Sequence, residues 1–358
     1  MRSRSANRCW NGALCRSSLH PIARALAAAI AFCAAPAALA QGEVDVLCSV
    51  PIAWCEAVAT AFQNETGIAV HLTQKGSAES LAQVVAEKGK PRHDVWYAGT
   101  GDAHLQAATL GLTEPYRSPM LRELHDWAMH EAERSKWHAV GIYTGALGIG
   151  YNTELIAKKR LPEPKCWADL ARPEYRDEVQ IADPRASTAT YSMIATFVQI
   201  FGEDKAFDLL RAMRPNTSGY PRTGAGAIRA VARGDAAIGV TFLHDGVTEI
   251  ANGFPVKLVV PCEGTGYEVG AMSIVKDAPN RTNAQRFYDW ALTPAAQRIG
   301  SDMKNFQTPS NKATPIPPVA PKMSEIKLIQ YDFAKYGTVT ERARLLEKWD
   351  REVRALPR

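Results

Sequence analysis

Small hydroxyl-bearing side chains recur where apolar runs of the sequence give way to amphipathic segments. Turns of this kind are Cys48-Ser49-Val50, Gly76-Ser77-Ala78, Gly99-Thr100-Gly101-Asp102, Ala186-Ser187-Thr188-Ala189-Thr190 and Thr223-Gly224-Ala225-Gly226. In a doubly wound sheet such turns lie at the carboxyl ends of the strands, where ligands bind. Helix N-termini at that edge present backbone N–H groups and the positive end of the helix dipole, which suit a phosphate or carboxylate. A single turn of this kind is usually just a helix N-cap, but several on one cleft predict an oxyanion site.

A second group of polar side chains comes later in the chain. His244 and Asp245 directly follow an apolar run, and Glu268 stands in another extended, glycine-containing segment. Because carboxylates accept several hydrogen bonds, these three residues facing a cleft would suit the hydroxyl groups of a sugar or polyol. The same residue types also bind metals, act as catalytic acids and bases, or close a hinge structurally. The sequence pattern leaves these three alternatives open.

Strand and helix patterns alternate along the chain and must position these residues. Strands are expected at residues 44–48, 68–72, 94–97, 179–182, 237–242 and 258–261. Helices are expected at residues 54–62, 80–87, 102–110, 191–201, 225–233 and 340–353. This alternation predicts an α/β protein with mostly parallel sheets covered on both faces.

Two long extended segments, residues 140–152 and 266–275, separate the α/β blocks. Two extended crossings between two lobes describe a hinge with a ligand cleft between the lobes. We expect lobe 1 to contain residues 41–143 and 267–320. Lobe 2 is expected to contain residues 144–266 and 321–358, with the proline-rich stretch 309–321 as a loop leading to the C-terminal helix.

The N-terminus has the pattern of a secretory signal. Five arginines precede an uncharged apolar run at residues 25–37, and Ala38-Leu39-Ala40 resembles a signal-peptidase site. We therefore expect cleavage near Ala40 and a periplasmic protein. Without residues 1–40 the chain has 37 basic and 37 acidic residues. This balance provides no net basic character for binding nucleic acid.

Four of the seven cysteines lie beyond the predicted signal: Cys48, Cys55, Cys166 and Cys262. In an oxidising compartment an even number predicts two disulfides, with three possible connectivities. A local bridge between Cys48 and Cys55 would leave Cys166 to pair with Cys262. Free thiols or a metal site are the alternative, but the sequence has no CxxC pair.

Several stretches resemble one protein family. They are Gly99-Thr100-Gly101-Asp102, Leu105-Gln106-Ala107-Ala108, Gly111-Leu112-Thr113-Glu114-Pro115-Tyr116, Pro164-Lys165-Cys166-Trp167, Phe242-Leu243-His244-Asp245, the run from Val260 to Glu268, and Tyr331-Asp332-Phe333-Ala334-Lys335-Tyr336-Gly337. The sequence is similar to the AfuA-type sugar-phosphate-binding proteins of bacterial ABC importers, which are relatives of the ferric-binding proteins. The resemblance extends over nearly all of the chain after residue 40. It implies the type II periplasmic-binding fold, with two doubly wound α/β lobes joined by two extended hinge crossings.

The resemblance also implies a function and site residues. A receptor of this kind is a soluble monomer that binds a phosphorylated sugar without a cofactor and delivers it to an inner-membrane permease. His244, Asp245 and Glu268 would bind sugar hydroxyls. The candidates for the phosphate shell are Ser49, Ser77, Thr100, Ser187, Thr188 and Thr190, with Arg185 or Arg222 as possible helpers.

The alternatives to a sugar phosphate are two other ligands and one other class of function. Ferric-binding relatives have an adjacent tyrosine pair where this chain has His244-Asp245, although Tyr191, Tyr220 and Tyr267 are also potential phenolate ligands. A phosphonate such as 2-aminoethylphosphonate would need a smaller pocket. An exported phosphatase is disfavoured because the sequence contains no GxSxG elbow, no HExxH and no second histidine at metal-ligand spacing. We therefore expect a binding protein, not an enzyme.

Overall fold

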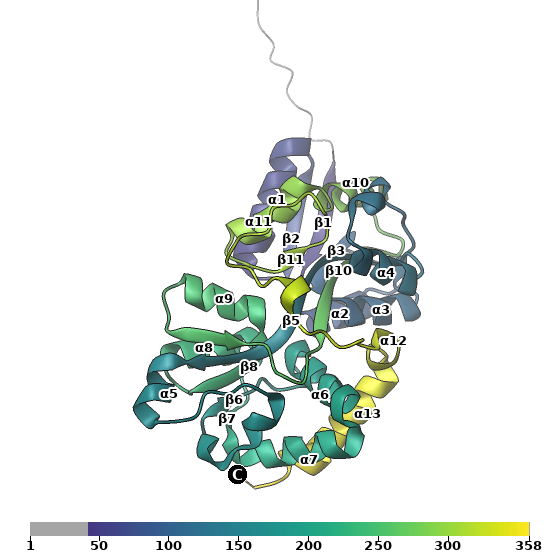
Figure 1. Ribbon diagram of the computed structural model, residues 1–358. Helices are drawn as coiled ribbons and strands as arrows, with labels where there is room; N and C mark the ends of the chain where they lie inside the picture. Colours follow the sequence, from purple (N-terminus) through teal and green to yellow (C-terminus); the bar gives the residue numbers. More distant parts are fainter. Residues whose placement is uncertain (1–41, 358) are drawn as a thin grey trace, which may run out of the picture. The chain divides into compact units, whose positions relative to one another are not determined.

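The computed structural model describes residues 42–357 (Figure 1). The predicted signal peptide, residues 1–40, lies outside the described residues. The described residues belong to one compact unit. Their strands form a connected sheet in the order β2-β1-β3-β10-β5-β8-β6-β7, which passes through two α/β lobes. The lobe limits given above stay a prediction.

Lobe 1 surrounds the β2-β1-β3-β10 part of the sheet, in which β1 pairs in parallel with both β2 and β3. Its strands are β1 (Glu43–Cys48), β2 (Ala69–Gln74), β3 (Val95–Thr100), β4 (Thr113–Glu114), β10 (Tyr267–Val275) and β11 (Thr308–Pro309). Its helices are α1 (Ile52–Thr66), α2 (Ser77–Ala86), α3 (Gly101–Thr109), α4 (Asp126–Arg134), α10 (Arg281–Ala291) and α11 (Pro294–Asp302). Its core contains edge-to-face aromatic contacts such as Phe62 on Phe287, with ring centroids 5.0 Å apart. Such pairs add to the free energy of apolar burial.

Lobe 2 surrounds the β8-β6-β7 part of the sheet, in which β6 pairs in parallel with β7 and β8. Its strands are β6 (Val179–Gln180), β7 (Thr217–Gly219), β8 (Ile238–Phe242) and β9 (Val256–Val259). Its helices are α5 (Thr153–Lys159), α6 (Thr188–Phe201), α7 (Glu203–Met213), α8 (Gly224–Arg233), α9 (Leu243–Ala251), α12 (Phe333–Tyr336) and α13 (Val339–Trp349). Helix α13 packs along α6 and α7, as Figure 1 shows, and buries Leu345 and Trp349 in the core of this lobe. Short 3₁₀ turns occur at Pro119–Glu123, Trp167–Ala171, Pro173–Tyr175, Arg214–Asn216 and Met323–Glu325, and a π-helical turn at Asp350–Arg354.

Strand β5 (Val140–Asn152) runs from one lobe into the other, and its bounds match the predicted crossing. Residues 140–146 pair with β10, and residues 147–152 pair with β8 and β9. The second predicted crossing, residues 266–275, contains β10. Residues 267–272 of β10 align antiparallel with residues 140–146 of β5, and its later residues pair with β3 and β4. The chain reaches this crossing from lobe 2 through residues 260–266.

Helices α2, α6 and α8 begin one to three residues earlier than predicted, at Ser77, Thr188 and Gly224. The hydroxyl-rich turns are therefore the first helical turns themselves. This is important for the site, since the first four N–H groups of a helix have no partner within it.

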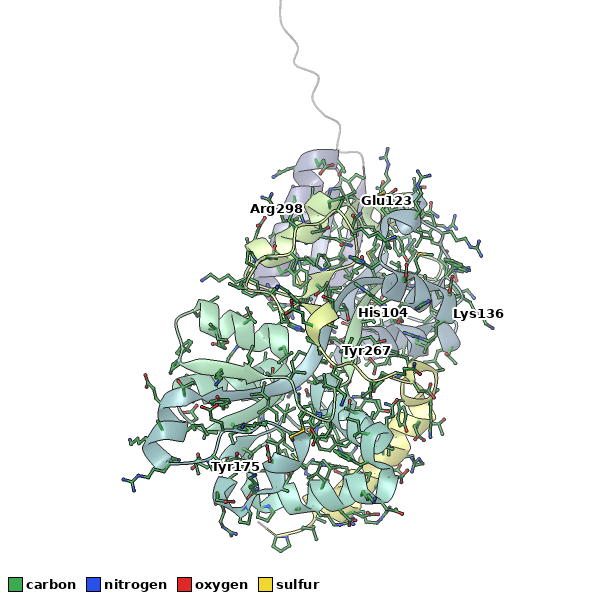
Figure 2. The ribbon with its side chains drawn as sticks, in the orientation of Figure 1. His104, Glu123, Lys136, Tyr175, Tyr267 and Arg298 are labelled. Atoms are coloured by element: carbon green, nitrogen blue, oxygen red, sulfur yellow. A yellow bond between two sulfur atoms is a disulfide. The ribbon has the colours of Figure 1, made fainter. Side chains whose placement is uncertain are left out.

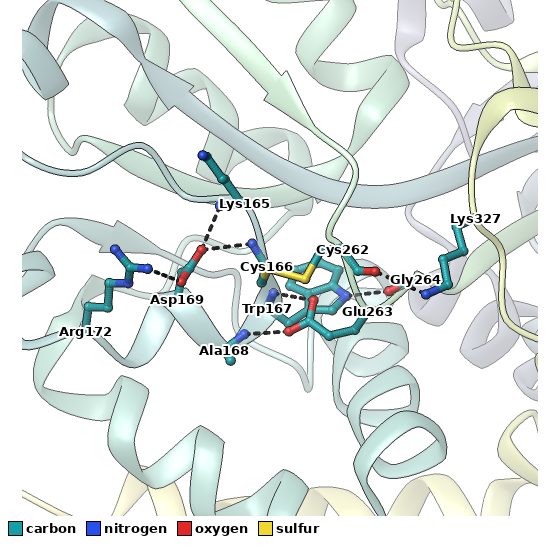
Figure 3. The surroundings of a disulfide bond; sticks show 10 residues. All are labelled: Lys165, Cys166, Trp167, Ala168, Asp169, Arg172, Cys262, Glu263, Gly264 and Lys327. Atoms are coloured by element: carbon teal, nitrogen blue, oxygen red, sulfur yellow. Dashed lines mark hydrogen bonds and ion pairs between the residues drawn. A yellow bond between two sulfur atoms is a disulfide. The ribbon is translucent and has the colours of Figure 1, made fainter.

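The four described cysteines form two disulfides, Cys48–Cys55 and Cys166–Cys262, as predicted. The alternative of free thiols or a metal site was wrong. The Cys166–Cys262 bridge attaches residues 260–266, through which the chain leaves lobe 2, to the rest of that lobe (Figure 3). Hydrogen bonds of the neighbouring Glu263 reinforce this attachment. Glu263 accepts from the backbone N–H groups of Trp167 and Ala168, at 2.8 and 3.0 Å.

No helix within residues 42–357 combines the length and the apolar character needed to cross a bilayer.

Candidate functional site

A cleft of about 220 Å³ lies between the two lobes, at the carboxyl ends of the strands. Eight of the nine predicted site residues line it: Ser49, Ser77, Thr100, Ser187, Thr188, His244, Asp245 and Glu268. Thr190 does not line it. It is the third residue of α6, and its side chain is buried at 1% exposure. The structure therefore brings the two predicted groups together on one cleft.

The lobe 1 wall is built from the ends of β1, β2 and β3. Two of its hydroxyls are already engaged: Trp96 Nε1 donates to Ser49 Oγ at 2.9 Å, and the Thr100 backbone N–H donates to Ser77 Oγ at 3.1 Å. The Thr100 hydroxyl is buried and has no hydrogen-bond partner in the described residues. An unpaired buried hydroxyl costs free energy unless a ligand or water satisfies it.

The turn before Thr100 has an unusual backbone that brings the main chain close to the two serines. Ala98 and Gly99 both have positive φ, 64° and 89°. A Cβ atom on Gly99 would lie 2.7 Å from Ser77 Oγ and 2.8 Å from the Cβ of Ser49. Only glycine fits here, because any side chain would displace both serines.

His104 supports this turn from within lobe 1, where Figure 2 labels it. Its Nε2 lies 3.0 Å from the Ala98 carbonyl and its Nδ1 lies 2.8 Å from Ser273 Oγ. Burial lowers the pKa of His104 to about 4, so the ring is neutral at pH 7. The neutral ring donates its Nε2–H to the Ala98 carbonyl and accepts from Ser273.

The lobe 2 wall presents the N-termini of α6, α8 and α9. Ser187 is the N-cap of α6, but its side chain does not cap that helix. The same is true of Thr100, the N-cap of α3 in lobe 1. Thr223 caps α8 by accepting from the Gly226 backbone N–H at 3.0 Å. Among residues 42–357, no lysine or arginine lines the cleft. An anion here would therefore be stabilised by N–H groups and hydroxyls instead of a cationic side chain.

The polar cluster at the hinge is made of His244, Asp245 and Glu268. His244 Nε2 lies 3.8 Å from Asp245 Oδ1 and 3.8 Å from Glu268 Oε1, which is outside hydrogen-bond range. His244 Nδ1 is buried without a partner in the described residues. A Cβ on Gly145 of β5 would lie 2.2 Å from that nitrogen, so the glycine leaves room for the ring.

Burial controls the protonation of this cluster. It lowers the pKa of His244, against the opposing charge of Asp245. It also raises the pKa of Glu268 well above its ordinary value, an effect to which the charges of Asp245 and Asp102 add. These shifts favour a neutral histidine and oppose loss of the Glu268 proton, so the cluster offers both hydrogen-bond donors and acceptors.

The two arginines predicted as helpers do not line the cleft. Arg185 forms an ion pair with Asp350, away from the site. Arg222, from lobe 2, lies 3.5 Å from Glu79 of lobe 1. Both side chains of this second pair are largely exposed, so it contributes little to stability.

Tyr191, Tyr220 and Tyr267, the potential phenolate ligands, do not line the cleft. Tyr191 instead donates to the Tyr336 carbonyl at 2.5 Å, and Tyr267 lies midway between the lobes (Figure 2). The described tyrosine that does line the cleft is Tyr143 of β5. Burial is the largest cause that raises the pKa of its phenol well above the ordinary value. The three tyrosines named above as potential phenolate ligands are therefore not in the lining of this cleft.

Sequence reasoning missed Tyr143 and Gln307, which also line the cleft. Tyr143 lies within the predicted crossing, but nothing in an extended segment indicates which side chains face a ligand. Gln307 precedes β11 in an irregular loop, with no pattern to indicate it.

The two-lobed α/β fold and the polar cleft at the strand ends define a periplasmic solute-binding protein of the type II fold. The chain belongs to the family of bacterial extracellular solute-binding proteins, whose family model matches residues 90–336. It is 45% identical over 318 residues to an uncharacterized protein of Haemophilus influenzae, covering 88% of this chain and 92% of that protein.

The structure of the periplasmic binding protein AfuA from Actinobacillus pleuropneumoniae, with exogenous fructose-6-phosphate bound, is 40% identical in sequence. It superposes with a TM-score of 0.84 over 88% of this chain and 100% of that one. The major ferric iron-binding protein of Neisseria meningitidis is more distant. It is 24% identical over 258 residues, covering 68% of this chain and 73% of that protein.

Proposed function

We propose that this protein is a periplasmic receptor for a hexose phosphate, which it delivers to an ABC permease in the inner membrane. The observation that carries the proposal is the combination of groups on one cleft. N-terminal helix turns with hydroxyls and the His244–Asp245–Glu268 cluster both line it. The 40% identity to AfuA, whose structure contains fructose-6-phosphate, supports the same ligand class.

In this proposal the phosphate binds at the N-termini of α3 and α6, near Thr100, Ser187 and Thr188. Several helix N-termini and a low-dielectric surrounding stabilise a dianion without a lysine or arginine. Binding would also satisfy the Thr100 hydroxyl, which is buried and unpaired. Closing of the lobes excludes water and so strengthens these charge-assisted hydrogen bonds.

The sugar hydroxyls bind to the His244–Asp245–Glu268 cluster. Asp245 accepts hydrogen bonds from them, and Glu268 and the Nε2 side of the His244 ring are further partners. This end repels a second anionic group, because Asp245 already has a negative charge. The orientation of the ligand follows from that repulsion.

The remaining parts of the proposal are localisation and partners. The N-terminal segment directs export and is removed near Ala40, and the mature protein acts as a monomer without a cofactor. The family places such proteins outside the cytoplasm, with a transport function. Nucleic acid is not a partner, since the mature chain has balanced charge.

A thermal-unfolding screen of the mature protein, purified free of ligand, tests the proposal. The panel contains fructose 6-phosphate, glucose 6-phosphate, the two free sugars, inorganic phosphate, 2-aminoethylphosphonate and ferric citrate. A ligand at a hundred times its Kd stabilises the folded state by ~2.7 kcal/mol, which is readily detected. We expect stabilisation by sugar phosphates and not by the free sugars or phosphate alone.

The other outcomes identify the alternatives. Stabilisation only by ferric citrate or only by the phosphonate would overturn the hexose phosphate and keep the transport function. Release of inorganic phosphate from the sugar phosphates during incubation would instead indicate a phosphatase.

A further inference from the structure

The motif Tyr331–Gly337 has no role in the cleft, although it stood out in the sequence. Its aromatic residues line a separate cavity of about 20 Å³, which shares Thr100 and Glu268 with the cleft. Its helix, α12, lies between α3 and α4 of lobe 1 and α13 of lobe 2 (Figure 1). The motif is thus directly behind two predicted ligand contacts.

This segment makes contacts with both lobes. Towards lobe 1, Gln106 Nε2 donates to the Gly337 carbonyl at 3.2 Å, and the Arg134 guanidinium stacks 4.5 Å from the ring centroid of Phe333. Towards lobe 2, Tyr336 is buried in the hydrophobic core and its carbonyl accepts from Tyr191. Relative motion of the lobes must therefore change contacts at this segment.

Arg342, five residues after the motif, joins the two helices that face each other across the cleft. Its Nη1 lies 3.4 Å from Oδ2 of Asp102, in the first turn of α3. Its guanidinium also stacks 4.3 Å from the ring centroid of Tyr191, near the start of α6. The side chains of Arg342 and Asp102 are only 16% and 17% exposed, so water screens the pair less than a surface ion pair.

We propose that Arg342 and the Tyr331–Gly337 segment form an interlobe clamp that sets the spacing of the α3 and α6 N-termini. Arg342 is a positioning residue and does not line the cleft. An anion bound between two helix N-termini depends on their separation, because charge–dipole stabilisation is confined to the first turn. A planar guanidinium suits this position because it pairs with a carboxylate and stacks on a ring at the same time.

The test uses Arg342→Gln and Arg342→Lys, with Arg344→Gln as the matched control on the same helix. Arg344 forms ion pairs with Glu203 and Glu341 and none with lobe 1. Spin labels at the exposed positions Lys88 and Lys158 report the interlobe distance by pulsed EPR. Binding of fructose 6-phosphate is followed by calorimetry and by its dissociation rate.

We expect Arg342→Gln to broaden or lengthen the interlobe distance distribution without ligand and to weaken binding about fivefold to tenfold, mainly through faster dissociation. Arg342→Lys should recover part of both effects, since it keeps the charge opposite Asp102. Arg344→Gln should change neither. Wild-type distances in Arg342→Gln would overturn the clamp.

The binding measurement rests on the proposed function, whereas the distance measurement does not. If the wild-type protein binds no hexose phosphate, the proposed function fails and the distances alone decide the clamp. If Arg342→Gln does not fold, Asp102→Asn removes the same pair from the lobe 1 side. An unchanged distance distribution in Asp102→Asn would overturn the clamp as well.

Discussion

At the scale of single residues, burial decides what the hinge cluster offers to a ligand. His244 is 4% exposed and Glu268 is 8% exposed, and burial shifts the pKa of each towards the uncharged form. Asp245 is less buried, with 26% of its side chain exposed, and it accepts from Thr241 Oγ1 at 3.3 Å. The cluster thus places two buried groups and one more exposed group together at the cleft, with both hydrogen-bond donors and acceptors.

The first residue-scale prediction concerns Asp245→Asn. This change keeps the shape of the side chain but removes a charged acceptor, whose hydrogen bonds contribute about 1.5–3 kcal/mol. We expect hexose phosphate binding to weaken about 10-fold to 100-fold, with little change in thermal stability. Isothermal titration calorimetry measures this, and Asp235→Asn, an exposed site in the same lobe, is the control. Wild-type affinity in Asp245→Asn would remove the residue from the site.

The second residue-scale prediction concerns pH and His104. The folded protein holds its pKa at about 4, against 6.5 in the unfolded chain. Between these values the unfolded chain binds a proton that the folded protein does not, so the free energy of unfolding falls as the pH drops. The full effect is about 3 kcal/mol and is reached below pH 4. Urea unfolding from pH 7 to pH 4 should show a steeper loss in the wild type than in His104→Asn, and equal slopes would contradict the prediction.

At the scale of elements, the β3–α3 turn shows how a strand end is shaped to receive a ligand. His104 of α3 holds the Ala98 carbonyl, and Gly99 brings the backbone against Ser49 and Ser77. Gly101 is similarly restricted, because a Cβ there would lie 2.8 Å from Glu131 Oε1 and from the Val269 carbonyl oxygen. Short-range packing therefore fixes the start of α3 where the phosphate is proposed to bind.

A Gly99→Ala substitution tests this turn. The added Cβ is forced against Ser77 and also strains a residue at positive φ, which costs about 1–2 kcal/mol. Gly89→Ala is the matched control, since Gly89 has φ of 80° and no atom within 4 Å of its Cβ position. We expect chemical denaturation to show a lower free energy of unfolding for both variants. Only Gly99→Ala should bind hexose phosphate more weakly. Equal affinities in the two variants would contradict the proposed role of the turn.

At the scale of the whole molecule, the hinge consists of one continuous strand and one returning segment that is fixed to lobe 2. β5 is shared by the two lobes, and the segment from Pro261 to Gly266 is fixed to lobe 2 by a disulfide and by the Glu263 contacts. Motion between the lobes is therefore expected to concentrate around Thr265 and Gly266, where the anchored segment joins β10. Tight packing of Gly266 against Thr196 and Tyr331 limits that motion.

The two disulfides should differ in their effect on stability. Cys166–Cys262 closes a separation of 96 residues and Cys48–Cys55 one of 7. In the chain-entropy model the longer loop contributes about 5 kcal/mol and the shorter about 2 kcal/mol. Calorimetry should therefore show a lower Tm for the Cys166→Ser/Cys262→Ser double variant than for Cys48→Ser/Cys55→Ser. The reverse order would indicate that removing the longer bridge relieves strain or leaves a structured unfolded state.

The sequence by itself determined the α/β class, the crossing strand at residues 140–152 and most of the cleft residues. These features are local: alternation of apolar and amphipathic segments sets the strand ends, and the strand ends place the hydroxyl-rich turns on one edge. It also determined that the chain beyond residue 40 has an even number of cysteines, which allows two disulfides.

Only the tertiary structure decided the rest. Residues Gln307 and Tyr143 reach the cleft, Thr190 does not, and Arg342 meets Asp102 across 240 positions of sequence. The neutral states favoured for His244 and Glu268 depend on burial by both lobes and on the charges of Asp245 and Asp102. Periodicity and turn chemistry are short-range, whereas desolvation and charge coupling depend on which distant segments pack together.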